Sequence, residues 1–246
     1  MSIPENIASI RERIDSAARR AGRRSEDIAL MAVSKTFPAE DIRAAYGAGL
    51  RLFGENRVQE FTGKIDALRD LRDAEWHLIG HLQTNKAAKA VELFAAVDSV
   101  DSLRLAQKLN ASAQQLKKKL EVLIEINVGG EAAKSGMAPD SSELEDLLLA
   151  APELEHLKFC GLMTVPPWTE DPEQARPYFR KLRELRDQNA ARRLPCVDMN
   201  ALSMGMSHDF EVAIEEGSTC VRVGTAIFGE RPVTTETRSR RGNPKE

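Results

Sequence analysis

The sequence has little of what marks disulfide-rich, metal-binding or membrane-spanning proteins. Its three cysteines, Cys160, Cys196 and Cys220, are scattered and show no CxxC spacing, which favours reduced thiols over a disulfide framework or a zinc site. No apolar run approaches the length that crosses a bilayer, and the N-terminus is too charged for a signal peptide. These absences predict a soluble, cytoplasmic protein.

Neither sign of charge is in large excess. The 35 basic and 38 acidic side chains leave a formal net charge of −3, which creates no cationic field of the kind that attracts nucleic acid or anionic lipid. We therefore expect neither a nucleic-acid partner nor a membrane partner. With 246 residues, 42% of them hydrophobic, the chain is long enough to bury a substantial core.

What the sequence does have is a regular alternation of strand and helix patterns. Ser2 and Glu5 have capping-box spacing ahead of isoleucines at helical intervals, which predicts an N-terminal helix. The patterns that follow predict eight strands, at 28–33, 50–56, 75–80, 94–100, 121–128, 157–165, 197–204 and 220–229. Seven helices are predicted between them, at 39–49, 57–71, 84–93, 101–120, 141–151, 172–190 and 209–217.

This alternation requires parallel strand pairing. Eight strand and helix units in a chain of this length predict an α/β fold, a single (β/α)₈ TIM barrel with an extra N-terminal helix, over residues 1–230. A doubly wound open sheet is the alternative. Residues 231–246 lack apolar periodicity and are predicted to form a disordered C-terminal tail. No long apolar stripe is left over once each helix has packed on the barrel, which favours a monomer.

Functional groups of such barrels gather where the strands end, at their C-terminal edge. Lys35 follows the first predicted strand, and Asn56 follows the second. A lysine at a barrel mouth suggests Schiff-base chemistry, because partial desolvation or a cationic neighbour lowers the pKa of the amine and frees its lone pair. A solvated surface lysine is the alternative interpretation.

The last two predicted strands strengthen the chemical interpretation, because barrels often bind phosphate after strands seven and eight. Ser203 lies in "LSMGMS", and Gly224 and Thr225 lie in "VRVGTAIFG", where backbone N–H groups could cap an anion. An amine opposite a phosphate cup, with Arg222 between them, is what pyridoxal 5′-phosphate requires of a protein. Arg222 would face the pyridine nitrogen and, as a donor only, would weaken the ring as an electron sink. An ion pair between Arg222 and a rim carboxylate is the alternative.

Other candidate sites are weaker. His77 and His81 are four residues apart, but in a predicted strand and turn instead of a helix, so we predict no metal site. Glu55 and Glu125 could be the paired carboxylates of a hydrolase, but nothing in the sequence sets their separation. The three cysteines lie within or beside predicted strands and are expected to be small core residues, not nucleophiles.

Several long motifs resemble a known family. They read "AVSKTFP", "LFGENRVQE", "WHLIGHLQTNK", "EINVGGEAAKSGM", "CGLMTV" and "LSMGMSHDFEVAIEEGSTCVRVGTAIFGER". Together they closely resemble the YggS/PROSC family of pyridoxal phosphate homeostasis proteins, over nearly the whole chain up to Arg231. The resemblance implies the barrel of the alanine racemase N-terminal domain, with pyridoxal 5′-phosphate held as an internal aldimine on Lys35.

The resemblance also implies roles for the other site residues. Ser203, Gly224 and Thr225 would hold the phosphate, Arg222 would lie by the pyridine nitrogen, and Asn56 would line the pocket. The implied role is to store, buffer or deliver the vitamin B6 cofactor, with PLP-dependent apoenzymes as candidate recipients, and without robust catalytic activity.

The tyrosines bear on whether the protein is an enzyme or a carrier. A two-domain racemase of this fold takes its second acid or base, a tyrosine, from an additional β-domain. This chain ends soon after its last predicted strand, and Tyr46 and Tyr178 both lie in predicted helices. Efficient two-base racemisation is therefore not expected. A carrier is the leading hypothesis, a low-activity amino-acid racemase is the alternative, and an adaptor that binds a partner according to its PLP occupancy is a third.

Overall fold

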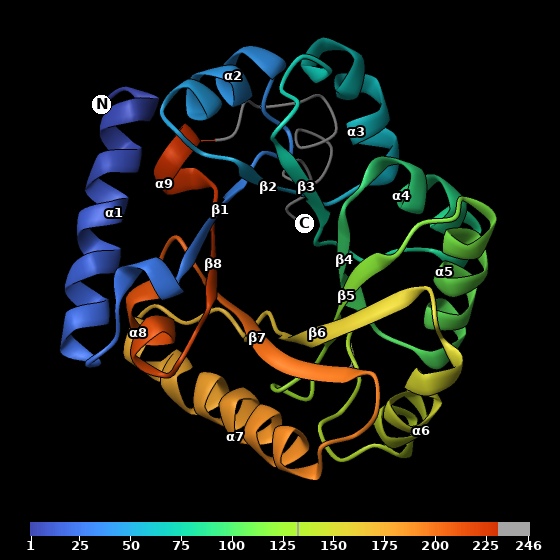
Figure 1. The fold of residues 1–246 in the computed structure, drawn as a ribbon. Coiled ribbons are helices and arrows are strands. Elements are labelled where there is room, and N and C mark those ends of the chain that lie inside the picture. The colour runs from blue at the N-terminus through green and yellow to red at the C-terminus, as the bar shows by residue number, and fades with distance from the viewer. Residues whose placement is uncertain (132, 231–246) are drawn as a thin grey trace, which may run out of the picture.

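The protein is a closed barrel of eight parallel strands (Figure 1). This computed structural model describes residues 1–131 and 133–230, so the predicted tail at 231–246 lies outside the described residues. The strands, in chain order around the barrel, are β1 (Ala29–Val33), β2 (Leu52–Glu55), β3 (Glu75–Leu78), β4 (Ala96–Val100), β5 (Leu120–Glu125), β6 (Leu157–Met163), β7 (Val197–Met206) and β8 (Cys220–Val223). The predicted TIM barrel is confirmed, and the open sheet is wrong.

The barrel closes because the first and last strands pair with each other. β8 lies parallel to β1, with Met31 opposite Arg222 and Ala32 opposite Val223. This pairing brings the residues that follow β1 and β8 to the same end of the barrel. Functional groups from the beginning and the end of the barrel sequence therefore lie close together.

Helices surround the barrel on its outside, as Figure 1 shows. Within the described residues, seven of them connect successive strands, as predicted: α2 (Ala39–Gly47), α3 (Val58–Lys64), α4 (Ala87–Leu93), α5 (Leu103–Gln115), α6 (Ser142–Ala150), α7 (Arg176–Arg192) and α8 (Phe210–Glu215). Two more flank the barrel, α1 (Ile3–Arg20) before β1 and α9 (Thr225–Phe228) after β8. In the described part of the chain no helix is long and apolar enough to cross a membrane.

The N-terminal helix α1 begins at the predicted capping box. The Ser2 side chain accepts from the backbone N–H of Glu5, and the Glu5 carboxylate accepts from the backbone N–H of Ser2. Ile7, Ile10 and Ile14 are buried, as the helical spacing predicts. Their face packs α1 against α8, α9 and α2, across the seam where the barrel closes.

Polar contacts from α1 reach the helices on both sides of β8, α8 before it and α9 after it. Arg13 pairs with Glu211 of α8 at 2.8 Å, and its guanidinium lies 4.5 Å from the centre of the Phe210 ring. The Asn6 side-chain amide donates to the backbone carbonyl of Ile227 in α9 at 2.8 Å. The extra helix thus holds α9 in place at the barrel mouth.

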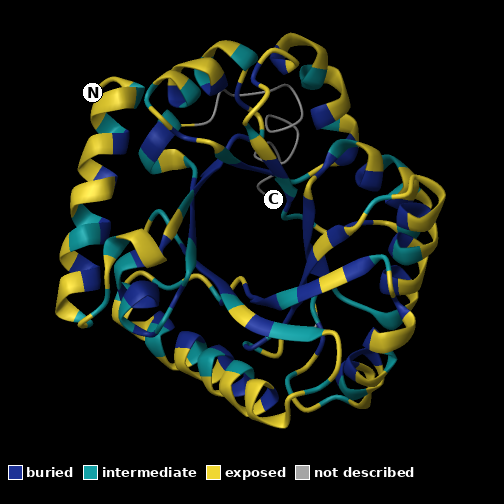
Figure 2. Cartoon of the chain, viewed as in Figure 1, coloured by how far each residue is buried: buried dark blue, intermediate teal, exposed yellow. Residues whose placement is uncertain are grey.

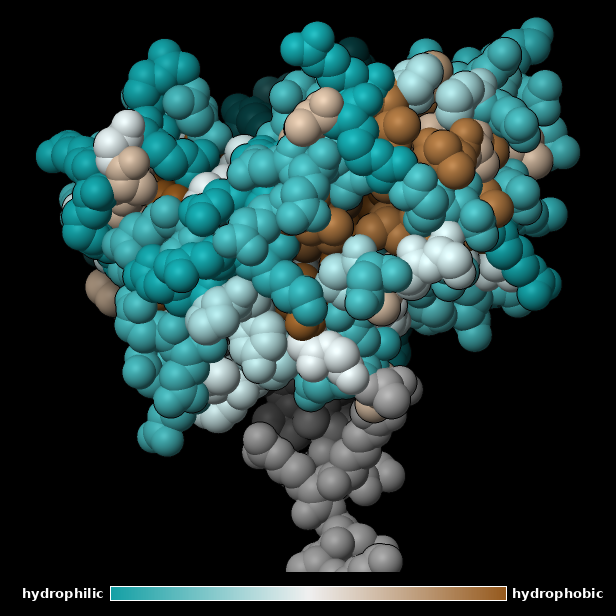
Figure 3. Space-filling view, turned by 90° about the horizontal axis from the view of Figure 1, so that it is seen from below, coloured by the Kyte–Doolittle hydropathy of each residue, from teal (hydrophilic) through white to brown (hydrophobic). Residues whose placement is uncertain are grey.

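Burial follows the two layers of the fold. In Figure 2 the strands and the inward faces of the helices are mostly buried, and the outward faces of the helices are exposed. The face seen in Figure 3, which is the lower side of Figure 1 with α6 and α7, is largely hydrophilic with small apolar areas. The apolar core therefore lies between the barrel and its helices.

Several predicted strand ends differ from the structure, and two of these errors matter for the site. The seventh strand continues to Met206 instead of ending at residue 204, and the eighth ends at Val223 instead of residue 229. The apolar "TAIF" that follows is the short helix α9, with Ile227 fully buried. A short apolar run has no periodicity that separates strand from helix, so the sequence alone could not place this boundary.

Candidate functional site

A cavity of about 440 Å³ opens at the C-terminal end of the strands. Its walls come from the ends of β1, β2, β3, β7 and β8 and from the segment after β6. The residues that line it are Val33, Lys35, Phe37, Asn56, Ile79, Val165, Trp168, Met206, Ser207, His208, Arg222, Gly224 and Thr225. The cavity is thus at the end of the barrel where functional groups of this fold gather.

Lys35 enters the cavity from a tight turn directly after β1. The backbone N–H of Phe37 donates to the carbonyl of Ser34 at 3.2 Å, which closes a four-residue turn with Lys35 at its second position. Thr36, at the third position, has a φ of 67°, in the left-handed region that glycine normally occupies in such turns. The turn directs the lysine side chain to the wall of the cavity.

Five of the six predicted site residues line this cavity together: Lys35, Asn56, Arg222, Gly224 and Thr225. The sixth, Ser203, does not. Ser203 is completely buried inside β7 and lies one layer below the cavity, because β7 continues for three residues beyond it. The residue that the longer strand brings to the cavity is Ser207, at the other end of the same "LSMGMS" motif.

Ser207 meets the start of α9 and was missed by sequence reasoning. Its Oγ accepts from the backbone N–H of Gly224 at 3.3 Å and from that of Ala226 at 3.4 Å. These are long hydrogen bonds, so the two N–H groups are only weakly satisfied. Ser207, Gly224 and Thr225 together present a hydroxyl and backbone donors to the cavity, which suits an anion.

Arg222 forms the floor of the cavity and is held in a fixed orientation. Nη1 donates to Oγ of Ser203 at 2.7 Å, and Nη2 donates to the backbone carbonyl of Thr164 at 2.7 Å. Burial lowers the pKa of the guanidinium from its usual value, but a guanidinium remains charged at physiological pH and can only donate. An acceptor atom that reaches the floor of the cavity therefore meets a preorganised donor.

The charges of the lining are of one sign. The cavity is lined by the cationic side chains of Lys35 and Arg222 and by His208. None of the described residues that line it is a carboxylate. A partly enclosed cavity with cations and backbone donors favours a small anionic ligand. The amine of Lys35 adds the capacity to react with an aldehyde.

Asn56 is positioned by the close approach of two strand ends. A Cβ atom built on Gly80 would lie 2.4 Å from the backbone carbonyl oxygen of Asn56, so only glycine fits beside it. The backbone N–H of Ile79 also donates to the carbonyl of Glu55 at 2.9 Å. The glycine of "HLIGH" thus allows the chain after β2 and the chain after β3 to form one wall of the cavity.

Beneath the cavity, the barrel interior holds the largely buried ionisable groups His77, Asp98 and Glu125, whereas His81 is exposed. Nδ1 of His77 lies 3.0 Å from the Asp98 carboxylate. Burial opposes the charged imidazole, but the charge and hydrogen bond of Asp98, with the charges of Glu75 and Glu121, together outweigh it and raise the pKa of His77. Burial, with the nearby charge of Asp101, raises the pKa of Glu125 to about 7. His81 pairs separately with Asp101 at 2.9 Å. In the described part of the chain no cluster of three such groups could hold a metal ion.

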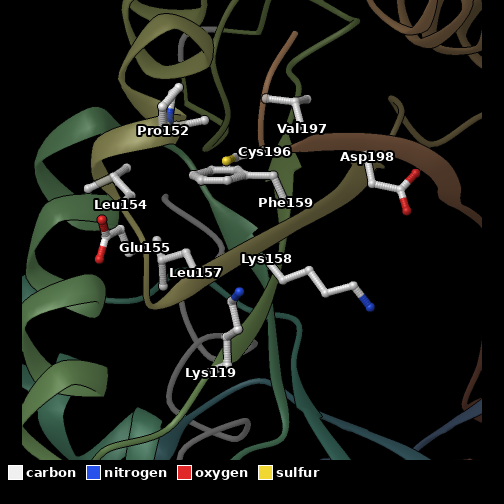
Figure 4. A pocket seen from close by; sticks show the side chains of 11 residues that line it. Lys119, Pro152, Leu154, Glu155, Leu157, Lys158, Phe159, Cys196, Val197 and Asp198 are labelled. Atoms are coloured by element: carbon white, nitrogen blue, oxygen red, sulfur yellow. The ribbon is translucent and has the colours of Figure 1, made fainter. Parts of the chain in front are cut away.

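A larger cavity, of about 630 Å³, lies at the opposite end of the barrel, by the starts of β6 and β7. In Figure 4 the ring of Phe159 lies beside Cys196, with Lys119 and Lys158 below them. The lining mixes both signs of charge, with Asp198 also present, and Lys158 is paired with Glu121 at 2.7 Å. This is the end of the fold that serves stability, so we assign the functional site to the smaller cavity.

The cysteines differ from the prediction that they are core residues. Cys196 is exposed, and Cys160 and Cys220 are half-buried. Burial raises the pKa of Cys160 to about 11 and that of Cys220 to about 12, so both thiols stay protonated near neutral pH. Cys196 is exposed because it lies in the turn before β7, with a φ of 62°.

Comparison with known proteins agrees with the geometry. The model of the family described as alanine racemase, N-terminal domain, matches residues 6–232. The chain is 50% identical over 231 residues to the pyridoxal phosphate homeostasis protein of Aquifex aeolicus, covering 94% of this chain and 99% of that protein. It is 44% identical over 236 residues to the protein of the same name from Escherichia coli strain K12, covering 93% and 97%.

Solved structures share the fold. PipY of Synechococcus elongatus PCC7942, solved with PLP bound, is 37% identical with a TM-score of 0.80, covering 93% of this chain and all of that chain. An alanine racemase of Clostridium difficile 630 has a TM-score of 0.70 at 16% identity, covering 96% of this chain and 59% of that chain. The second likeness concerns the barrel alone.

Proposed function

Since this chain belongs to the family of pyridoxal phosphate homeostasis proteins, within the alanine racemase N-terminal domain fold, we propose that it binds pyridoxal 5′-phosphate and takes part in the homeostasis of that cofactor. The observation that carries the proposal is the cavity at the barrel mouth, where Lys35 and Arg222 meet backbone donors and no lining residue is a carboxylate. The PLP-bound relative of the same fold supports it.

Five of the lining residues fit parts of the cofactor. Lys35 supplies the amine that joins the aldehyde with loss of one water. Ser207, Gly224 and Thr225 would hold the phosphate, and Arg222 would donate to the ring nitrogen. Bound in this way, the cofactor supplies an electrophilic carbon, and the Arg222 donor disfavours protonation of the ring nitrogen, so electron withdrawal by the ring is weak. Ser203 acts through Arg222, whose guanidinium it orients.

We propose a carrier instead of a racemase. Neither tyrosine lines the cavity, and both lie in helices, Tyr46 in α2 and Tyr178 in α7. The hydroxyl of Tyr46 is hydrogen-bonded to Asp73, away from the cavity. The relatives at 44–50% identity are named as homeostasis proteins. The protein would act as a cytoplasmic monomer, and PLP-dependent apoenzymes would be its recipients.

The test is covalent labelling of the purified protein. After incubation with PLP, an absorption band in the near-ultraviolet to blue range should appear and should be bleached by borohydride, and peptide mapping should find the pyridoxyl group on Lys35. Lys35→Ala should lose both signals. The matched control is Lys89→Ala, since Lys89 lies on the surface of α4, where it pairs with Glu92.

Two results would contradict the proposal. Wild-type protein that remains colourless and unlabelled in excess PLP would remove the cofactor site altogether. If the labelled protein racemises an amino acid with rapid, saturable turnover, it is a racemase and not a carrier.

A further inference from the structure

A network of charged residues lies directly behind the turn that carries Lys35. Its centre is the ammonium group of Lys64, at the end of α3, which is largely buried. This ammonium donates to the Glu55 carboxylate at 2.8 Å, to the Glu60 carboxylate at 3.1 Å and to the backbone carbonyl of Ser34 at 3.1 Å. One cation thus joins two carboxylates to the residue that precedes Lys35.

The same two carboxylates hold the turn from both sides of Lys35. Glu55 accepts from the hydroxyl of Ser34 at 2.7 Å, and Glu60 accepts from the backbone N–H of Thr36. Glu55 is fully buried, and its second oxygen, Oε2, has no hydrogen-bond partner among the described residues. The residues before and after Lys35 are therefore anchored to one network, although Lys35 itself lines the cavity.

The network compensates for an unfavourable backbone conformation. Thr36 is β-branched and has a φ of 67°, a region that such residues rarely adopt without support from the surrounding structure. This conformation directs the backbone N–H of Thr36 to the Glu60 carboxylate, which accepts a hydrogen bond from it. If the anchor is lost, the turn can relax and the Lys35 amine moves from its place beside the cavity.

We propose that Lys64 is a positioning residue, which through Glu55 and Glu60 holds the Ser34–Phe37 turn and so sets the rate at which the cofactor leaves Lys35. The inference rests on the proposed function, because it concerns release from that site. The inference extends that function by assigning control of cofactor retention to Glu55, Glu60 and Lys64, none of which lines the cavity. Slow release follows from a rigid turn, and fast release from a loosened one.

The first experiment needs no cofactor. Hydrogen exchange of the chain without PLP, followed on a peptide that covers residues 34–37, should be at least about tenfold faster in Lys64→Met than in the wild type, because the Thr36 N–H loses its anchored acceptor. Lys89→Met, which removes an exposed lysine of α4, should leave this peptide unchanged. Equal exchange in wild type and Lys64→Met would overturn the proposal.

The second experiment measures release. Protein loaded with PLP is diluted into alkaline phosphatase, which removes free cofactor, and the decay of the bound absorption band is followed. Lys64→Met should release PLP about tenfold faster, since relief of backbone strain is of that order. Glu60→Ala removes the Thr36 acceptor without leaving a fully buried charge, and should give the same result if Lys64→Met folds poorly.

A double substitution separates positioning from general loss of stability. Thr36→Gly places at this position the residue that tolerates a positive φ, so in the Lys64→Met background it should restore release to within about threefold of the wild type. The proposal would be overturned if the double variant released PLP as fast as Lys64→Met alone. It would also be overturned if Lys64→Met released PLP at the wild-type rate. A wild type that never loads PLP would instead overturn the proposed function, and the exchange experiment distinguishes these failures.

Discussion

Arg222 donates a hydrogen bond from Nη1 to Oγ of Ser203 at 2.7 Å, and both side chains are buried inside the barrel. The contact joins β8 to β7 directly below the cavity. A guanidinium with two of its nitrogens held by Ser203 and Thr164 has lost its rotational freedom before any ligand arrives. Ser203 therefore fixes the orientation of Arg222, and under the proposed function would act on the ligand through it.

Ser203→Ala is predicted to weaken both the fold and the site. It leaves an N–H of a buried guanidinium without its acceptor, which costs about 1–3 kcal/mol of the free energy of unfolding. Urea unfolding measures this loss, and equilibrium dialysis should show weaker PLP binding. Ser16→Ala is the control, since that hydroxyl donates to the carbonyl of Glu12 on the exposed side of α1. Unchanged stability in Ser203→Ala would show that Arg222 does not depend on the contact.

Ser207→Ala is predicted to act on binding alone. Its hydrogen bonds to the N–H groups of Gly224 and Ala226 are long, so the stability should change by less than about 0.5 kcal/mol. Loss of a hydrogen bond to a charged phosphate should weaken PLP affinity by about tenfold or more. Pyridoxal, which lacks the phosphate, should bind wild type and variant equally. If Ser207→Ala prefers PLP over pyridoxal as strongly as the wild type does, the phosphate binds elsewhere.

Gly80→Ala is predicted to disturb Asn56 without touching the ligand. The new Cβ would lie 2.4 Å from the Asn56 carbonyl oxygen, so the chain after β2 must shift, at a cost of about 1–3 kcal/mol. Both the midpoint of urea unfolding and the PLP affinity should fall. Gly47→Ala in α2 is the control, because open space surrounds that position and alanine is the better helix former. If Gly80→Ala and Gly47→Ala have the same stability and PLP affinity, the close approach of Gly80 to Asn56 does not position Asn56.

Glu125 is predicted to make stability depend on pH. Burial raises its pKa to about 7 in the folded protein from 4.5, so between these values the folded state binds more protons than the unfolded state. Stability therefore falls as pH rises from 4.5 to 7, by about 3 kcal/mol from this group. In Glu125→Gln this contribution disappears, and denaturant unfolding between pH 5 and 8 should show a flatter profile. The raised pKa of His77 also makes stability fall as pH rises, and this contribution should remain in Glu125→Gln.

The order and number of the barrel elements could be predicted because they depend on local patterns. Alternating apolar strands and helical periodicity are properties of neighbouring residues, as are the Ser2–Glu5 capping box and the lysine that follows β1. For the same reason five of the six candidate residues lie at the cavity. Each of them directly follows a strand or lies at its end.

What could not be predicted depends on strand register and on contacts between distant segments. Pairing with β8, which sets Met206 opposite Arg222, extends β7 and so exchanges Ser203 for Ser207 at the cavity. Glu55 was considered as a hydrolase carboxylate, yet it lies against Lys64 and Ser34, a grouping that only the folded α3 and the turn after β1 create. No spacing in the sequence measures such a contact.

The pairing of β1 with β8 also determines when the site can exist during synthesis of the chain. Lys35 leaves the ribosome early, whereas Arg222, Gly224 and Thr225 follow almost two hundred residues later. Because contacts of high sequence separation form slowly, Lys35 of a nascent chain is exposed long before Arg222, Gly224 and Thr225 can join it at the cavity. If the cofactor binds as proposed, its capture would follow completion of the chain, and bound cofactor would report that the barrel has closed.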